Sequence, residues 1–134
     1  IRGVAEKQSN QTLFYSKGWY DKWAFAKDKG EVGWQLVSKE PIANSTSKTW
    51  NDQQALLSKD EETPNARVVV YTMIGHFLAT GERLFKKIYV RTSSLDSDGS
   101  HVSVGYFASK GLSVSYWRDD LRNCDLCMSA ARKQ

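Results

Sequence analysis

The sequence lacks long apolar runs and has few prolines, which argues against a membrane-spanning or a disordered protein. No apolar run approaches the roughly 18–20 residues that cross a bilayer, so no transmembrane segment is predicted. Only two of the 134 residues are proline and 40% are hydrophobic, which indicates a globular chain rather than a disordered one. A chain of this length buries about two-thirds of its unfolded surface, and we therefore expect one domain, 1–134, that folds without a metal or disulfide.

The sequence also lacks long runs of one charge. Nineteen basic and 15 acidic residues give a net charge of +4, and no block of five or more basic residues occurs. This balance favours anionic partners such as nucleic acid, lipid headgroups or acidic polysaccharide, and it is equally typical of a plain basic protein.

Two N-glycosylation sequons bear on location. They are Asn10-Gln11-Thr12 and Asn44-Ser45-Thr46. From composition, about one such tripeptide is expected by chance. The second therefore favours a secreted, extracellular or particle-associated protein.

The N-terminal part of the chain is rich in aromatic residues. Residues 1–11 are polar and aperiodic and predict an arm. A short strand over Thr12–Tyr15 precedes a hairpin made of Trp19–Ala26 and Glu31–Ser38, with the turn at 27–30. Three of the four aromatic residues in the first hairpin strand share one face.

Two helices are predicted outside the central region. The first is short, near 50–58, with Thr49 as its N-cap and Asp52 in its first turn. The second, near 119–132, has acidic residues at its start, basic residues at its end and an apolar stripe that includes both cysteines.

The region from Arg67 to Trp117 holds the densest strand signal and predicts four strands. Arg67–Leu78 is apolar on both faces, which is typical of a strand within a sandwich or mixed sheet. Leu84–Arg91, His101–Phe107 and Leu112–Trp117 alternate and predict an antiparallel meander. The expected fold is mainly β: an antiparallel β-sandwich or open barrel of about six or seven strands.

The outward face of this meander is the strongest candidate for a ligand site. Its candidate residues combine aromatic rings, cations and a histidine: Phe85, Lys87, Tyr89, Arg91, His101 and Trp117. Such a face suits a glycan, through stacking of sugar C–H groups on aromatic rings, or single-stranded nucleic acid, through base stacking and phosphate contacts. The alternative is that the aromatic N-terminal hairpin covers this face.

Motifs for metal, redox or hydrolytic chemistry are incomplete. Asp96 and Asp98 begin a sequence like a calcium loop, but no closing acid follows, so a polar turn is the better interpretation. Cys124 and Cys127 form a single C-x-x-C, compatible with half a zinc site, a redox pair, a short-loop disulfide or two buried thiols on a helix. The last is favoured, and no cofactor or metal is predicted.

The two histidines are the candidates for an enzyme. His76 is interpreted as a core histidine hydrogen-bonded to a neighbour, and His101 stands at a strand start beside acidic residues. Neither is accompanied by a G-x-S-x-G or H-E-x-x-H motif, and no glycine-rich phosphate loop occurs.

The favoured function is therefore a non-enzymatic binding or structural β-domain. The strand pair 83–91 and 101–107 resembles β-sandwich modules from carbohydrate-binding domains to phage tail and fibre proteins, and it carries no signature that separates them. A glycan or other polar surface is the expected partner. The alternatives are a single-stranded nucleic-acid binder, a membrane-surface protein, a subunit of a homo- or hetero-oligomeric assembly such as a virion or tail, and a hydrolase using His76 or His101.

Overall fold

A computed structural model describes residues 36–109 and 111–133. The predicted arm, the strand at 12–15 and the hairpin residues 19–35 lie outside the described residues. The described elements follow one another as α3 (Trp50–Gln54), β1 (Glu61–Glu62), α4 (Ala66–Thr80), β2 (Tyr89–Leu95), β3 (His101–Ala108), β4 (Gly111–Tyr116), β5 (Leu126–Met128) and β6 (Ala131–Arg132).

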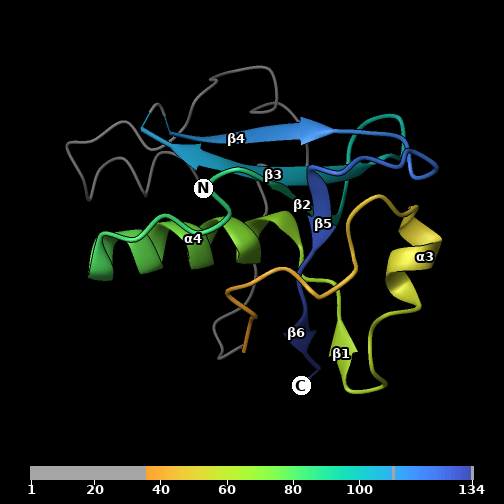
Figure 1. The fold of residues 1–134 in the computed structure, drawn as a ribbon, viewed down its shortest axis with the longest axis horizontal. Helices are drawn as coiled ribbons and strands as arrows, with labels where there is room; N and C mark the ends of the chain where they lie inside the picture. The colour runs from red at the N-terminus through yellow and green to blue at the C-terminus, as the bar shows by residue number, and fades with distance from the viewer. Residues whose placement is uncertain (1–35, 110, 134) are drawn as a thin grey trace.

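Four of these strands form one sheet in the order β4-β3-β2-β5 (Figure 1). β2 pairs antiparallel with β3, and β3 with β4, which confirms the antiparallel order of the predicted meander. The predicted strand Leu84–Arg91 is wrong in its bounds, because 84–87 form a turn and the strand spans Tyr89–Leu95. β5 joins the other edge of β2 in parallel. The prediction of a β-rich fold is confirmed, although the described residues form no closed barrel, and the sandwich stays a prediction.

The predicted strand Arg67–Leu78 is wrong, because this segment is helix α4. Asn65 caps the helix by accepting a 2.8 Å hydrogen bond from the Val68 N–H, and Gly81 ends it with φ of 79°. Apolar residues recur at helical spacing on one side and are buried: Ala66, Val69, Val70, Met73, Ile74 and Phe77. The other side of the helix also carries many apolar residues. The helical period of 3.6 residues was therefore hard to recognise, and the segment was interpreted as a strand.

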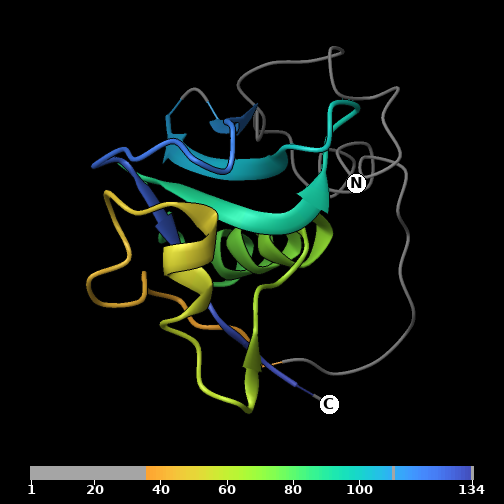
Figure 2. The same ribbon diagram turned by 90° about the vertical axis from the view of Figure 1, so that its right-hand side faces the viewer.

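Helix α4 lies along one face of the four-stranded sheet (Figures 1 and 2). Its buried side chains pack with Val90 of β2, Val104 of β3 and Val114 of β4, which are aligned across the sheet. This packing is the hydrophobic core. The opposite face of the sheet, here called the second face, is therefore the one on which a site could be built.

The predicted helix near 119–132 is also wrong, because this segment contains a loop and strands β5 and β6. The acidic residues that suggested a helix start instead make contacts outside it; Asp119 pairs with His101 at 2.8 Å. β6 pairs antiparallel with β1, and Val37 bridges Ala131 from the other side. This smaller sheet lies away from the four-stranded sheet, on the α4 side (Figures 1 and 2).

The shorter predicted helix is confirmed in its first turns. Helix α3 spans Trp50–Gln54, and Thr49 caps it by accepting a 3.2 Å hydrogen bond from the Asp52 N–H. The helix lies at the end of the sheet where the β2–β3 hairpin loop and the segment after β4 also lie (Figure 1). It is therefore placed to contact that end of the second face.

A β-bulge in β3 changes which side chains reach each face. Gly105 pairs with Ser113, but the next pair joins Ala108 to Gly111, so β3 has one extra residue. Tyr106 occupies it with φ of 49°. Regular alternation predicted Tyr106 on the core face and Phe107 on the outer face, whereas Phe107 is fully buried in the core and Tyr106 lies against Tyr89 of the second face.

Candidate functional site

Strand register defines the residues of the second face. Tyr89 of β2 is aligned with Gly105 of β3 and Ser113 of β4, and the next row contains Arg91, Ser103 and Ser115. The prediction that these side chains share one face of the sheet is therefore correct. The two rows differ in environment: Tyr89 is partly exposed, whereas Arg91 and Ser103 are fully buried.

Three aromatic residues gather at the first row and form what we call the aromatic cluster: Tyr89, Tyr106 and Trp117. The Tyr89 ring centroid lies 4.7 Å from that of Tyr106 and 4.9 Å from that of Trp117, at interplanar angles of 44° and 89°. Tilted and edge-to-face contacts at these distances are favourable for aromatic rings. All three side chains are partly exposed, so the cluster offers ring surface to solvent.

Hydrogen-bonding groups border the aromatic cluster. The Tyr89 hydroxyl donates to the Ser113 hydroxyl at 2.9 Å. The pKa of Tyr106 is raised above its ordinary value, first by hydrogen bonding of its phenol with the Asp125 carboxylate and then by burial. The cluster therefore combines ring faces with hydroxyl and carboxylate groups, as a site for a polar ligand requires.

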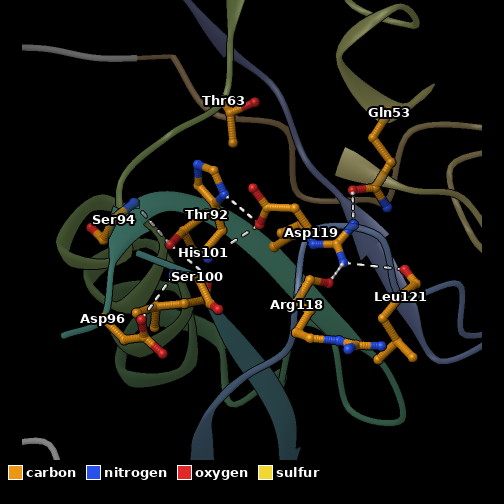
Figure 3. A network of polar contacts seen from close by, with 12 residues as sticks. Gln53, Thr63, Thr92, Ser94, Asp96, Ser100, His101, Arg118, Asp119 and Leu121 are labelled. Atoms are coloured by element: carbon orange, nitrogen blue, oxygen red, sulfur yellow. Dashed lines mark hydrogen bonds and ion pairs between the residues drawn. The ribbon is translucent and has the colours of Figure 1, made fainter. Parts of the chain in front are cut away.

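Arg91 closes the other end of the second face rather than presenting a charge to solvent. Its guanidinium donates to the Lys48 and Arg118 carbonyl oxygens at 3.4 and 3.2 Å, to Leu121 O at 3.3 Å and to Gln53 Oε1 at 3.1 Å. Figure 3 shows Gln53, Arg118 and Leu121 converging at this point. Burial lowers the pKa of Arg91, and the Asp119 carboxylate opposes this shift. Arg91 thus joins α3 and the loop after β4 to the sheet.

His101 lies beside this arrangement and pairs with Asp119. Its Nδ1 is 2.8 Å from Asp119 Oδ1 (Figure 3). The Trp50 ring stacks on the imidazole with centroids 3.5 Å apart. A carboxylate on Nδ1 fixes the ring orientation and leaves Nε2 as a potential base. Among the described residues, however, the imidazole of His101 has no hydrogen-bond partner other than Asp119, so no nucleophile is aligned with it.

The six predicted site residues separate into three environments. Tyr89 and Trp117 meet in the aromatic cluster. Lys87 is exposed in the turn before β2 and His101 is partly exposed at the α3 end. Phe85 and Arg91 are buried. Phe85 does not face outward as predicted, because it lies in a turn with φ of 53° and packs in the core. Arg91 lies on the predicted face but is enclosed there by carbonyl oxygens.

The other predicted motifs take local structural roles. His76 on α4 contacts Glu82 through Nε2 at 2.6 Å, as expected of a histidine paired to a neighbour, but it is partly exposed and lies outside the core. Asp96 Oδ1 accepts from the N–H groups of Asp98 and Ser100, which supports the polar-turn interpretation.

The two cysteines are free and differ in exposure. Cys124 is exposed, whereas Cys127 is buried on the core side of β5. Burial raises the pKa of the Cys127 thiol to about 12. The interpretation of two buried thiols on a helix is therefore wrong, because the segment is a strand preceded by a turn.

Tyr106 and Asp125 are the members of the site that the sequence interpretation missed. Gly105 was a usable signal for Tyr106, since a glycine within a strand often marks a bulge. Asp125 lies in the segment predicted as helix, and no local pattern links it to Tyr106, which is 19 positions away.

Comparison with known proteins gives no relative from which to transfer a function. No protein-family model matches the chain, nor does any curated protein or solved structure. In the part of the chain that the structure describes, no helix is long and apolar enough to cross a membrane, and no three acidic, histidine or cysteine residues gather as a metal site. Function must therefore be inferred from the geometry of the second face.

Proposed function

We propose that this protein is a non-enzymatic glycan-binding β-domain that uses the aromatic cluster as its binding surface. The observation that supports the proposal is the gathering of Tyr89, Tyr106 and Trp117, all partly exposed, beside hydroxyl and carboxylate groups. A pyranose ring presents an apolar C–H face and a rim of hydroxyls. The ring surfaces suit the former and the polar border suits the latter.

The surroundings of the aromatic cluster favour a glycan over nucleic acid. Binding of single strands combines base stacking with cations that follow the phosphates. Of the two predicted cations that lie two positions from Tyr89, Lys87 is exposed in the turn before β2, whereas Arg91 is buried against carbonyl oxygens and does not reach solvent. The carboxylate of Asp125 acts on Tyr106 of the cluster, and a carboxylate repels phosphate.

The test is binding of immobilised glycans and of a single-stranded oligonucleotide at two salt concentrations. We expect glycan binding that changes little with salt, since phosphate contacts would make affinity fall steeply as salt rises. Trp117→Ala should weaken binding about tenfold, because one stacking contact contributes roughly 1–3 kcal/mol. Tyr71→Ala is the matched control, since Tyr71 is an exposed aromatic residue on α4, away from the second face.

Three results would overturn the proposal. One is the absence of glycan binding by the wild-type protein. Another is equal loss of binding in the Tyr71→Ala and Trp117→Ala variants, each shown to be folded by circular dichroism. The third is salt-sensitive binding of the oligonucleotide alone, which would identify a nucleic-acid binder.

A further inference from the structure

We propose that Asp125 makes the aromatic cluster selective for neutral, hydroxyl-rich glycans and excludes glycans that carry carboxylate or sulfate groups. This inference rests on the proposed function and names the ligand class of the same site. Three features carry it: the fixed position of Asp125, the free hydrogen-bonding capacity of its carboxylate, and its uncompensated charge.

The main chain holds Asp125 beside the aromatic cluster. Its carbonyl oxygen accepts a 2.7 Å hydrogen bond from the Tyr89 N–H. Its own N–H donates to Asn123 Oδ1 at 2.7 Å, so the turn before β5 is closed by a side chain. Because β5 pairs with β2 in parallel from Tyr89 onward, Asp125 is tied to the first residue of the strand that carries the central ring of the cluster.

The carboxylate retains acceptors for a ligand. Two carboxylate oxygens offer about four acceptor positions. The Cys124 thiol approaches Oδ1 at 3.9 Å, and the carboxylate also acts on the Tyr106 phenol, whose pKa it raises. Asp125 is exposed, so the remaining positions face solvent. Hydroxyl groups of a sugar stacked on the cluster can donate to them, and hydrogen bonds to a charged acceptor are stronger than neutral ones.

The charge of Asp125 has no basic partner within the described part of the chain. Arg118 pairs with Asp120 at 3.4 Å and Arg122 with Asp52 at 3.6 Å, and neither reaches Asp125. An anionic ligand on the aromatic cluster would therefore meet an unpaired like charge at its border. Discrimination of this kind comes from repulsion of the wrong ligand as well as from attraction of the right one.

The experiment compares ligands of equal length that differ in charge. Wild-type protein is titrated with cellohexaose, chitohexaose and mannohexaose as neutral probes and with hexagalacturonate as the anionic probe. We expect at least one neutral probe to bind, and the anionic probe to bind about tenfold more weakly at low salt. In Asp125→Asn, the neutral probe should lose about three- to tenfold in affinity and the preference over hexagalacturonate should shrink to about twofold or less.

Asp98→Asn is the matched control. Asp98 is an exposed acid in the β2–β3 turn, and its substitution changes the net charge by the same amount. It should leave the neutral-to-anionic ratio unchanged. A merely structural role of Asp125 would weaken both probes together, so the ratio separates selectivity from folding.

The outcomes distinguish this inference from the function on which it rests. If the wild-type protein binds no glycan, the proposed function fails and the inference with it. If the wild-type protein binds a neutral glycan but Asp125→Asn keeps the same neutral-to-anionic ratio, the glycan-binding function stands and the role of Asp125 is refuted. A wild-type preference for hexagalacturonate refutes the inference directly.

Discussion

The ring of Tyr106 lies 4.7 Å from that of Tyr89, although Tyr89 is aligned with Gly105 and regular alternation would turn the next residue to the opposite face. The bulge in β3 brings them together: the extra residue adopts a φ of 49° at Tyr106 and the alternation resumes one position later. One irregular residue thus completes the aromatic cluster and also directs Phe107 into the core.

The first prediction concerns Gly105, which the backbone of Ile88 and Tyr89 approaches closely. A Cβ atom at this position would meet the Ile88 carbonyl oxygen and would lie 2.8 Å from the Tyr89 Cα. Backbone atoms cannot move aside cheaply, so we expect Gly105→Ala to lower the free energy of unfolding by about 2 kcal/mol or more, measured by urea denaturation.

Gly75→Ala should instead raise the free energy of unfolding. Gly75 lies inside α4, is exposed, and has no atom within 4 Å of an added Cβ. Alanine loses less backbone entropy than glycine when a helix forms, so this variant should gain about 1 kcal/mol. A Gly105→Ala variant as stable as the wild type would contradict the close approach of the Ile88 and Tyr89 backbone to this position.

The sequence predicted the meander well because its signal is local. Two-residue alternation identified both strands, in 101–107 and in 112–117. The turn between them was identified from Gly111, which has φ of 103°. The bulge was not predicted, because nothing in the alternation marks where an extra residue enters. This one error exchanged the faces of Tyr106 and Phe107.

The two large errors have a different origin. Segment 66–80 is rich in valine and aromatic residues, which suit strands, yet packing against the sheet selects the helix. Its cap residues Asn65 and Gly81 were the available signals. At the C-terminus the order of charges resembled a helix, but Asp119 contacts His101 and the Cys127 backbone joins β2. Local sequence patterns do not indicate such long-range pairings.

The second prediction concerns Arg91. Arg91→Met keeps an unbranched, flexible side chain but is shorter and removes the donors for three carbonyl oxygens and Gln53 Oε1. Buried acceptors without donors are costly, and we expect a loss of about 3 kcal/mol in the free energy of unfolding. Arg118→Ala is the control, since its side chain is 81% exposed and should change stability by only about 0.5 kcal/mol. Equal effects of the two substitutions would argue against the structural role of Arg91.

The third prediction concerns the two cysteines, which are the only ones in the chain. In the folded protein at pH 8 a disulfide-based thiol reagent should modify Cys124 alone, because it is exposed, whereas Cys127 is buried with a pKa of about 12. The reagent should count one thiol in buffer and two in denaturant. Cys124→Ser should reduce the count in buffer to none, and rapid reaction of two thiols in the native state would show that Cys127 is accessible.

The raised pKa of Cys127 also has a consequence for stability. Because the folded-state pKa is above the ordinary value of 9.0, the contribution of the neutral thiol is complete below about pH 9 and is lost as the pH rises toward 12. Cys127→Ala removes the titrating group. The alkaline fall in unfolding free energy should therefore be shallower in this variant over that range.

The fourth prediction tests the contact between Tyr106 and Asp125 without any ligand. The hydrogen bond to the carboxylate raises the pKa of Tyr106 above its ordinary value of 10.0, because a phenolate would lose that bond and face a like charge. A spectroscopic tyrosinate titration of the wild type, with Tyr106→Phe to assign the difference, should therefore show Tyr106 ionising above pH 10. Asp125→Asn should lower that pKa, since the carboxylate charge is gone, whereas Asp98→Asn should not.

The stabilising contribution of the neutral Tyr106 phenol is complete below pH 10 and disappears as the pH rises through the folded-state pKa. If Asp125→Asn leaves the Tyr106 titration unchanged, the carboxylate does not contact the phenol, and Asp125 is not part of the polar border of the aromatic cluster.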